Sequence, residues 1–186
     1  MATCALAATR AFRSMMRFRA IPVHFSSSSE GKKDLSHVDP SSNMPRMVDV
    51  GEKATSARSA TAVATVAFPA DVAKTLRLGK SDDVRSAKGP VITTATIAGV
   101  MGAKKTADLI PFCHPLAIED CAFEVRVADE GTSLDIECTV KVSGKTGVEM
   151  EALVGASVAA LCVYDMTKAL SHNIEIRSTR LLAKSK

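Results

Sequence analysis

An aspartate and a lysine, Asp165 and Lys168, stand three positions apart near the end of a long apolar segment. At this spacing they share one face of a helix, where an exposed ion pair contributes only about 0.2–0.5 kcal/mol. Inside an apolar helix such a pair is more typical of acid/base chemistry, because desolvation lowers a lysine pKa and a nearby carboxylate opposes that shift. The pair therefore predicts a proton-transfer site.

A second group of candidate residues lies in a short loop bracketed by Pro111 and Pro115. Two prolines at this spacing stiffen the backbone, so Phe112, Cys113 and His114 are presented rigidly. A lone histidine is ordinarily a structural residue, but this presentation favours contact with a ligand. Because no second Cys/His cluster accompanies the loop, the sequence predicts no metal site.

A third group, Glu149, Met150 and Glu151, opens the long apolar segment. Acidic residues at a helix start can simply complement its dipole, although that role explains neither Met150 nor the apolar run that follows. The preceding residues 143–146 (SGKT) resemble the end of a phosphate-binding P-loop. The first glycine of that motif is absent, so the NTPase interpretation is rejected, although an anion could still lie near the helix start.

The distance between these groups constrains how a site is built. Glu151 and Asp165 are 14 residues apart, which corresponds to about 21 Å along a helix. One small substrate could not touch both within a single chain. If both serve one site, the sequence predicts that this site is shared between subunits.

Several cations accompany these residues. Lys88 precedes a Gly-Pro pair in a loop, Lys104 lies on the apolar face of a predicted helix, and Lys53 and Arg58 fall in a polar N-terminal stretch. Such cations suit a phosphorylated substrate. Solvated charge, with lysine stems extending along apolar surface, is the alternative interpretation.

The elements that position these groups follow from hydrophobic periodicity. After a loop over residues 34–60, strands are predicted at 61–68, 121–127, 134–142 and 174–182, and helices at 69–78, 92–109 and 147–170. The order β-α-β-β-α-β predicts a ferredoxin-like α+β fold, an antiparallel sheet with helices on one face. The last helix is apolar nearly all round, so part of its cover is expected from another subunit.

Charge separates the first 33 residues from the rest. They hold six of the 24 basic residues and one of the 20 acidic ones, a net +5, which leaves 18 − 19 = −1 for residues 34–186. A stretch rich in Arg and Ser and poor in acids predicts a mitochondrial transit peptide over 1–33. A plastid address or a disordered basic tail are the alternatives. A chain of 186 residues has room for one domain of ordinary size, and this domain is expected over residues 34–186.

Composition argues against several other classes. The five cysteines are odd in number and contain no C-x-x-C pair, so reduced thiols are expected. No stretch of 18 consecutive apolar residues indicates a membrane span. Few aromatic residues and a net charge of −1 after the leader argue against RNA binding. A non-catalytic ferredoxin-like module that binds a small ligand stays open.

Six segments in order then carry a family resemblance. They are Met47–Val50, Lys88–Val91, Ala98–Thr106, Leu109–Pro115, Thr146–Leu153 and Tyr164–Ala169. From Leu35 to Lys184 the chain resembles the cyclic pyranopterin monophosphate synthase family of molybdenum-cofactor biosynthesis. It departs mildly from the family pattern at Phe112, Thr167 and Lys105, and lacks the usual glycine-lysine tail. A different pterin or nucleotide lyase would share most of this chemistry.

The resemblance implies a lyase that acts on cyclised dihydro-GTP and releases pyrophosphate. It implies a homohexamer, a trimer of dimers with the active site at the dimer interface, and no required cofactor, with Mg²⁺ assistance to the triphosphate left open. Asp165, Lys168 and Lys88 are implied as catalytic. Substrate contacts are implied for eight residues, namely Phe112, Cys113, His114, Glu149, Met150, Glu151, Lys53 and Arg58.

Overall fold

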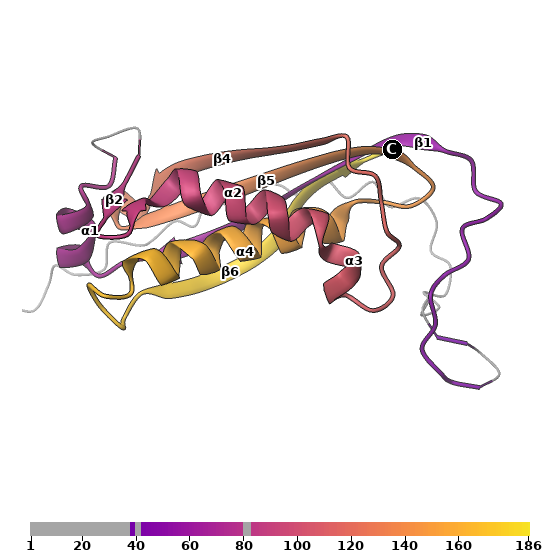
Figure 1. The fold of residues 1–186 in the computed structure, drawn as a ribbon, viewed down its shortest axis with the longest axis horizontal. Coiled ribbons are helices and arrows are strands. Elements are labelled where there is room, and N and C mark those ends of the chain that lie inside the picture. Colours follow the sequence, from indigo (N-terminus) through magenta and orange to yellow (C-terminus); the bar gives the residue numbers. More distant parts are fainter. Residues whose placement is uncertain (1–37, 40–41, 80–82) are drawn as a thin grey trace, which may run out of the picture.

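Four long strands form the central sheet of the computed structural model, which describes residues 38–39, 42–79 and 83–186. The strands are β1 (Ser56–Ala67), β4 (Asp120–Ala128), β5 (Ser133–Gly144) and β6 (Glu175–Ser185). They lie in the order β4-β5-β1-β6, and every neighbouring pair is antiparallel. Helices α2 (Val91–Lys104) and α4 (Glu149–Thr167) cover one face of this sheet (Figure 1). The predicted ferredoxin-like fold is confirmed.

The hairpin of β4 and β5 shows why the strands form where they do. Apolar residues alternate with polar ones along both strands, and the inward-facing Leu134, Ile136 and Cys138 are almost completely buried. The predicted turn is a short 3₁₀ segment, Asp129–Gly131, in which Glu130 and Gly131 have φ of 54° and 96°. Positive φ favours glycine at the second of these positions.

The sheet differs from the prediction at two strand ends and in one additional hairpin. β1 begins at Ser56, five residues earlier than predicted, because the stretch of small residues around Ala57 pairs with the end of β5 although it lacks hydrophobic alternation. β6 continues to Ser185 and not only to residue 182, through pairing with β1. The expected polar connection before α2 contains a small hairpin of β2 (Arg85–Ser86) and β3 (Gly89–Pro90).

The helices also differ at their ends. The predicted helix at 69–78 is α1 (Ala70–Leu76), which stops where Arg77 adopts a left-handed conformation. The predicted helix at 92–109 is divided into α2 and α3 (Thr106–Leu109), separated at Lys105. The predicted helix at 147–170 is shorter, because α4 starts at Glu149 and ends at Thr167. Transit-peptide residues 1–33 lie outside the described residues.

Helices α2 and α4 approach each other closely through glycines. A Cβ placed on Gly99 would lie 3.0 Å from the carbonyl oxygen of Gly155 and 2.3 Å from Cζ of Phe123. A Cβ on Gly155 would lie 2.7 Å from Sγ of Cys138. Only glycine fits this crossing, because interiors are packed with few gaps.

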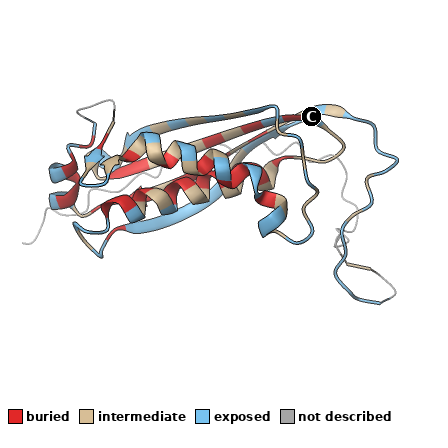
Figure 2. Ribbon diagram, viewed as in Figure 1, coloured by how far each residue is buried: buried red, intermediate tan, exposed pale blue. Residues whose placement is uncertain are grey.

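The outward faces of the two helices are apolar and exposed. Ile97 and Met101 of α2 and Leu161 of α4 each keep more than half of their surface exposed, whereas the inward faces are buried (Figure 2). Among the described helices, α4 alone is long and apolar enough to cross a membrane, but half of it is buried inside the fold, as in a core helix. The prediction of an all-round apolar helix is confirmed, and the residues that the structure describes leave its outer side exposed at Leu161.

Candidate active site

The candidate residues gather at the two ends of α4. We call the cavity at its N-terminal end the Cys-His pocket, and the three residues Lys88, Asp165 and Lys168 at its C-terminal end the Asp165 cluster. Figure 1 places α3 and the turn from β5 to α4 at one end of the helical layer, and the β2-β3 hairpin with the end of α4 at the other. Within one chain, the predicted site residues therefore form two separate groups and not one site.

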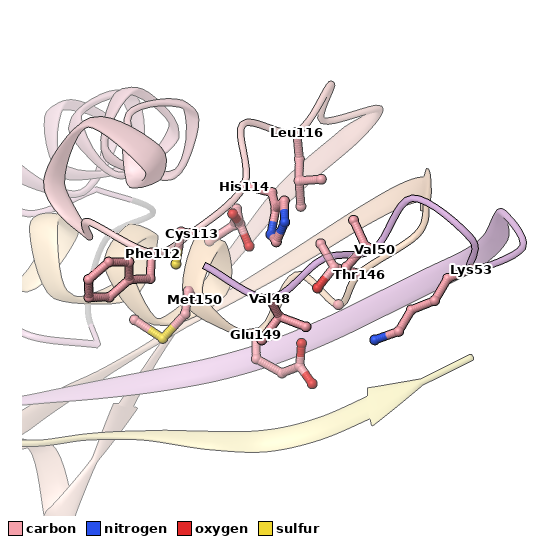
Figure 3. A pocket seen from close by; sticks show the side chains of 12 residues that line it. Val48, Val50, Lys53, Phe112, Cys113, His114, Leu116, Thr146, Glu149 and Met150 are labelled. Atoms are coloured by element: carbon pink, nitrogen blue, oxygen red, sulfur yellow. The ribbon is translucent and has the colours of Figure 1, made fainter. Parts of the chain in front are cut away.

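The Cys-His pocket has a volume of about 360 Å³ and is formed by three separate segments. They are the N-terminal segment before β1, the Pro-bracketed loop after α3, and the turn that leads into α4 (Figure 3). Its lining residues are Val48, Val50, Lys53, Phe112, Cys113, His114, Leu116, Thr146, Gly147, Glu149, Met150 and Glu151. Seven of the eight predicted substrate contacts therefore lie in one cavity.

The Pro-bracketed loop is fixed at its base. The amide of Ile110 donates to the carbonyl of Thr106 at 2.9 Å, and the amide of Cys113 donates to the carbonyl of Ile110 at 3.0 Å. Burial raises the pKa of the Cys113 thiol, and the negative charge of Glu151 adds to the effect. A thiol that stays protonated is a poor nucleophile. The loop is thus suited to contact a ligand and not to attack it.

Glu151 is a buried carboxyl in the first turn of α4, with only 4% of its surface exposed. Burial raises its pKa, its own backbone amide acts in the opposite direction, and the charge of Glu149 raises it further. A carboxyl in this setting takes up a proton more readily than an exposed one. Glu149 instead forms an ion pair with Lys184 of β6 at 3.0 Å. The two acids therefore have different electrostatic environments within one cavity.

The two predicted N-terminal cations differ in position. Lys53 lines the pocket, and its ammonium group extends along the pocket edge (Figure 3). Arg58 does not line it, and the prediction that it belongs to a loop is wrong, since it is part of β1. Its guanidinium donates to the carbonyls of Gly144 at 3.0 Å and Lys145 at 3.4 Å. Arg58 therefore holds the turn that leads into the pocket.

The Asp165 cluster is a carboxylate bound by two lysines. Oδ2 of Asp165 lies 2.7 Å from Nζ of Lys88, and Oδ1 lies 2.7 Å from Nζ of Lys168. Lys88 also donates to the backbone carbonyl of Asp165 at 2.8 Å. The three predicted catalytic residues are thus in direct contact, although Lys88 is 77 positions from Asp165 in sequence.

In this cluster, hydrogen bonds and charge affect the pKa values of Asp165 and Lys168 more than burial does. Hydrogen bonds from Lys168 and then from Lys88 lower the pKa of Asp165 to about 2. Asp165 in turn raises the pKa of Lys168, through a hydrogen bond and its charge. Desolvation acts to lower the pKa of Lys168, as expected, but the hydrogen bond and charge of Asp165 outweigh it, because about half of each side chain is exposed. At neutral pH, Lys168 carries a proton that it can donate, and Asp165 is ionised.

Several contacts of the site were not predicted. Val48, Val50, Thr146 and Gly147 fall within the segments that carry the family resemblance, so those segments held a signal for them. Leu116 directly follows Pro115, and its position next to the Pro-bracketed loop is the one sequence signal that could have identified it as a pocket residue. The ion pair of Lys184 with Glu149 joins residues 35 positions apart and left no local pattern in the sequence.

Cysteine and metal chemistry are limited in the part of the chain that the structure describes. Its four cysteines, Cys113, Cys121, Cys138 and Cys162, are free thiols, and of these Cys138 is buried and the other three are partly buried. Among these described residues, no three His, Cys, Asp or Glu side chains are grouped so that they could hold a metal ion.

The fold and the site define a ferredoxin-like α+β protein with a lysine-bound aspartate and an acid-lined cavity, and these side chains can exchange protons. Residues 47–186 match the MoaC family, and the chain belongs to that family. The chain is 57% identical over 150 residues to the cyclic pyranopterin monophosphate synthase of Xanthomonas oryzae pv. oryzae, covering 81% of this chain and 88% of the relative.

Relatives in longer proteins are also found. The chain is 47% identical to molybdenum cofactor biosynthesis protein 1 of Drosophila melanogaster, covering 81% of this chain and 26% of that protein. It is 44% identical to a molybdenum cofactor biosynthesis bifunctional protein of Synechocystis, with coverage of 81% and 43%. The matched region thus occurs both in chains of similar length and as part of larger proteins.

Proposed function

We propose that this chain is a cyclic pyranopterin monophosphate synthase, a lyase of molybdenum-cofactor biosynthesis. It converts cyclised dihydro-GTP to cyclic pyranopterin monophosphate and releases pyrophosphate. The observation that carries the proposal is the Asp165 cluster, in which two lysines lie 2.7 Å from one carboxylate, in a chain 57% identical to a named synthase. This grouping provides protons and positive charge at one point.

The Cys-His pocket is the proposed binding site for the substrate. A volume of about 360 Å³ is within the range of small-molecule sites. Phe112, His114 and Met150 provide contact surface for the ring system, and Lys53 provides positive charge at the edge for the triphosphate. Arg58 supports this site by holding the turn next to it, and its direct contact with the triphosphate stays part of the proposal.

The Asp165 cluster is the proposed catalytic group. Lys168 is protonated at neutral pH because Asp165 stabilises its ammonium form, and we assign to it the donation of this proton to the substrate. When the substrate's anionic groups engage Lys88 and Lys168, Asp165 loses ammonium partners, its pKa rises and it becomes a better base. The two ammonium groups also stabilise the negative charge that develops on the departing pyrophosphate.

The active site is proposed to form between two subunits. Pocket and cluster lie about 21 Å apart along α4, so a partner chain must bring its cluster to this pocket. The exposed Ile97, Met101 and Leu161 on the outer helical faces provide apolar area for such contacts. The proposed assembly is a homohexamer, a trimer of dimers with the active site at the dimer interface.

Cellular setting and cofactor use complete the proposal. We propose that residues 1–33 direct import into the mitochondrial matrix, on the strength of their net charge of +5 and their arginine and serine content. No cofactor is required for the chemistry proposed here. Mg²⁺ would accompany the triphosphate as part of the substrate and would add positive charge near the leaving group.

Pyrophosphate release tests the proposed reaction. The protein without residues 1–33 is incubated with cyclised dihydro-GTP, and pyrophosphate and the pterin product are measured. The wild type should form both, and Asp165→Asn should lower the rate by at least about 100-fold, as expected for loss of an acid/base group. Asp71→Asn, an exposed acid in α1, is the matched control and should retain full activity. Absence of product with wild type would instead favour a ligand-binding module.

A further inference from the structure

The position of Lys88 depends on a very short hairpin. Lys88 lies in the two-residue turn between β2 and β3, and β3 leads directly into α2 at Val91. Its side chain reaches from this turn to the Asp165 carboxylate and backbone carbonyl. A pair of two-residue strands is only marginally stable by itself. Other contacts must therefore hold the turn in place.

Asp83 provides these contacts from just before the hairpin. One oxygen of its carboxylate accepts from the amide of Ile92 at 2.8 Å. The other accepts from the amide of Thr93 at 3.2 Å and from its hydroxyl at 2.6 Å. The amide of Val91 also donates to the carbonyl of Val84 at 2.7 Å. These bonds connect the segment before the hairpin, residues 83–84, to the segment after it, residues 91–93.

This carboxylate replaces the cap that α2 lacks. The residue at the N-cap position is Pro90, and it makes no side-chain capping bond. Free amides at a helix start need acceptors, and the positive end of the dipole favours an anion. Burial alone would raise the pKa of Asp83, but hydrogen bonds from Thr93 and Ile92 outweigh it and hold the pKa below its ordinary value. Asp83 is therefore ionised at neutral pH.

We propose that Asp83 is a positioning residue that sets Lys88 opposite Asp165 by fastening the β2-β3 hairpin to the first turn of α2. Asp83 does not touch the reacting atoms, and the inference rests on the proposed catalytic role of Lys88. Loss of the Asp83 contacts frees the hairpin while α2 keeps its packing against α4. The amine of Lys88 then spends less time near the Asp165 carboxylate.

A double-mutant cycle between Asp83 and Lys88 tests the inference in the leaderless protein. Single-turnover pyrophosphate release is measured for Asp83→Ala, Lys88→Ala and the double variant, with enzyme in excess so that slow rates stay measurable. Asp83→Ala alone should lower the rate by roughly 10- to 100-fold, the scale of a misplaced catalytic group. In the Lys88→Ala background the same change should alter the rate by less than about twofold, because coupled residues are not additive.

Two smaller substitutions at the same contacts separate a loss of positioning from a loss of folding. Asp83→Asn keeps the shape and one acceptor oxygen, and Thr93→Val removes only the hydroxyl donor, so both should give smaller rate losses with the same dependence on Lys88. Asp71→Ala is the control for loss of an acid at the start of another helix. Circular dichroism and melting temperature check that each variant is folded, and if Asp83→Ala is not folded the cycle is decided with Thr93→Val.

The possible outcomes separate this inference from the proposed function. If Asp83→Ala lowers the rate equally with and without Lys88, it acts on general structure and the positioning role is wrong. Wild-type activity in Asp83→Ala and Thr93→Val would overturn it as well. Full activity in Lys88→Ala would overturn the role of Lys88 and, with it, this inference, while the proposed reaction still stands on Asp165.

Discussion

The Lys88 ammonium lies 2.7 Å from Oδ2 of Asp165, which joins a hairpin turn before α2 to the end of α4 across 77 positions of the sequence. Because Lys168 engages the other carboxylate oxygen at 2.7 Å, the acid is held from both sides. At neutral pH these two ammonium groups keep Asp165 ionised, and its pKa would rise if a competing anion drew them away. In the proposed mechanism, this contact would link substrate binding to the acid/base state of the cluster.

Replacing Lys168 by Met should raise the pKa of Asp165 from about 2 toward its ordinary value, since Lys168 makes the largest contribution to lowering it. Lys88→Met should give a smaller rise. A carboxyl with a lowered folded pKa stabilises the fold above its unfolded pKa, and this stabilisation is lost as pH falls through the folded value. A titration of the aspartate carboxyl carbons by ¹³C NMR measures the shift.

The matched control for this titration is Lys74→Met, which removes a lysine from the last turn of α1. It should leave the Asp165 titration unchanged. An unaltered pKa in Lys168→Met would show that the ion pair is not maintained in solution.

Gly99→Ala should destabilise the fold by about 1–3 kcal/mol, because added atoms in a tight core force side chains and backbone apart. The new Cβ would lie 3.0 Å from the backbone carbonyl of Gly155, which cannot move without shifting α4. Urea unfolding followed by circular dichroism measures the loss. Gly144→Ala is the matched control, since its nearest heavy atom is 3.6 Å away, and it should stay within about 0.5 kcal/mol of wild type.

The sequence predicted most of the sheet because hydrophobic alternation marks a strand with one buried face. It did not predict the start of β1, where Ser56 and Ala57 pair with β5 although small side chains leave no such pattern. Nor did it predict the short β2-β3 hairpin, which depends on Asp83 reaching the first turn of α2. The start of β1 depends on a partner distant in the chain, which local propensity does not encode, and the hairpin depends on side-chain contacts that hydrophobic alternation does not mark.

The candidate site was predicted largely through motifs, and the structure explains what they share. Phe112, Glu149 and Lys53 come from three segments that meet only when α3, α4 and the N-terminal segment are packed together. Electrostatics was harder to predict. The low pKa of Asp165 is caused first by Lys168, which is close in sequence, and then by Lys88, which is 77 positions away and could not be foreseen as a partner.

Glu151→Gln should remove a pH dependence of stability. Burial raises the folded pKa of Glu151, so the wild type binds this proton more tightly when folded, and its free energy of unfolding falls as pH rises from the ordinary glutamate pKa through the raised value. The glutamine variant has no charge to bury and should show a flatter dependence over this window. Urea midpoints measured between pH 4 and about 8 compare the two proteins across this titration range.

Glu175→Gln is the control for this comparison, because Glu175 is an exposed acid at the start of β6. Its profile should match that of the wild type. A Glu151→Gln profile as steep as that of the wild type would contradict a buried, proton-binding carboxyl in the pocket.

Mixing two inactive variants tests whether pocket and cluster come from different subunits. His114→Ala damages only the Cys-His pocket, and Asp165→Asn damages only the Asp165 cluster. If each site combines the pocket of one chain with the cluster of its partner, a mixed dimer holds one intact site and one doubly damaged site. Random exchange makes half of the dimers mixed, so activity should recover to about a quarter of wild type.

This recovery is measured as pyrophosphate release after the two variants are unfolded together and refolded. The double variant His114→Ala/Asp165→Asn, refolded with wild type, is the control, because its mixed dimers also hold one intact and one doubly damaged site if pocket and cluster come from the same chain. In that case the control mixture would keep half of the wild-type activity and the two single variants would not complement. Sharing across subunits instead predicts that wild type mixed with the double variant keeps only about a quarter, since every site in its mixed dimers carries one damaged half.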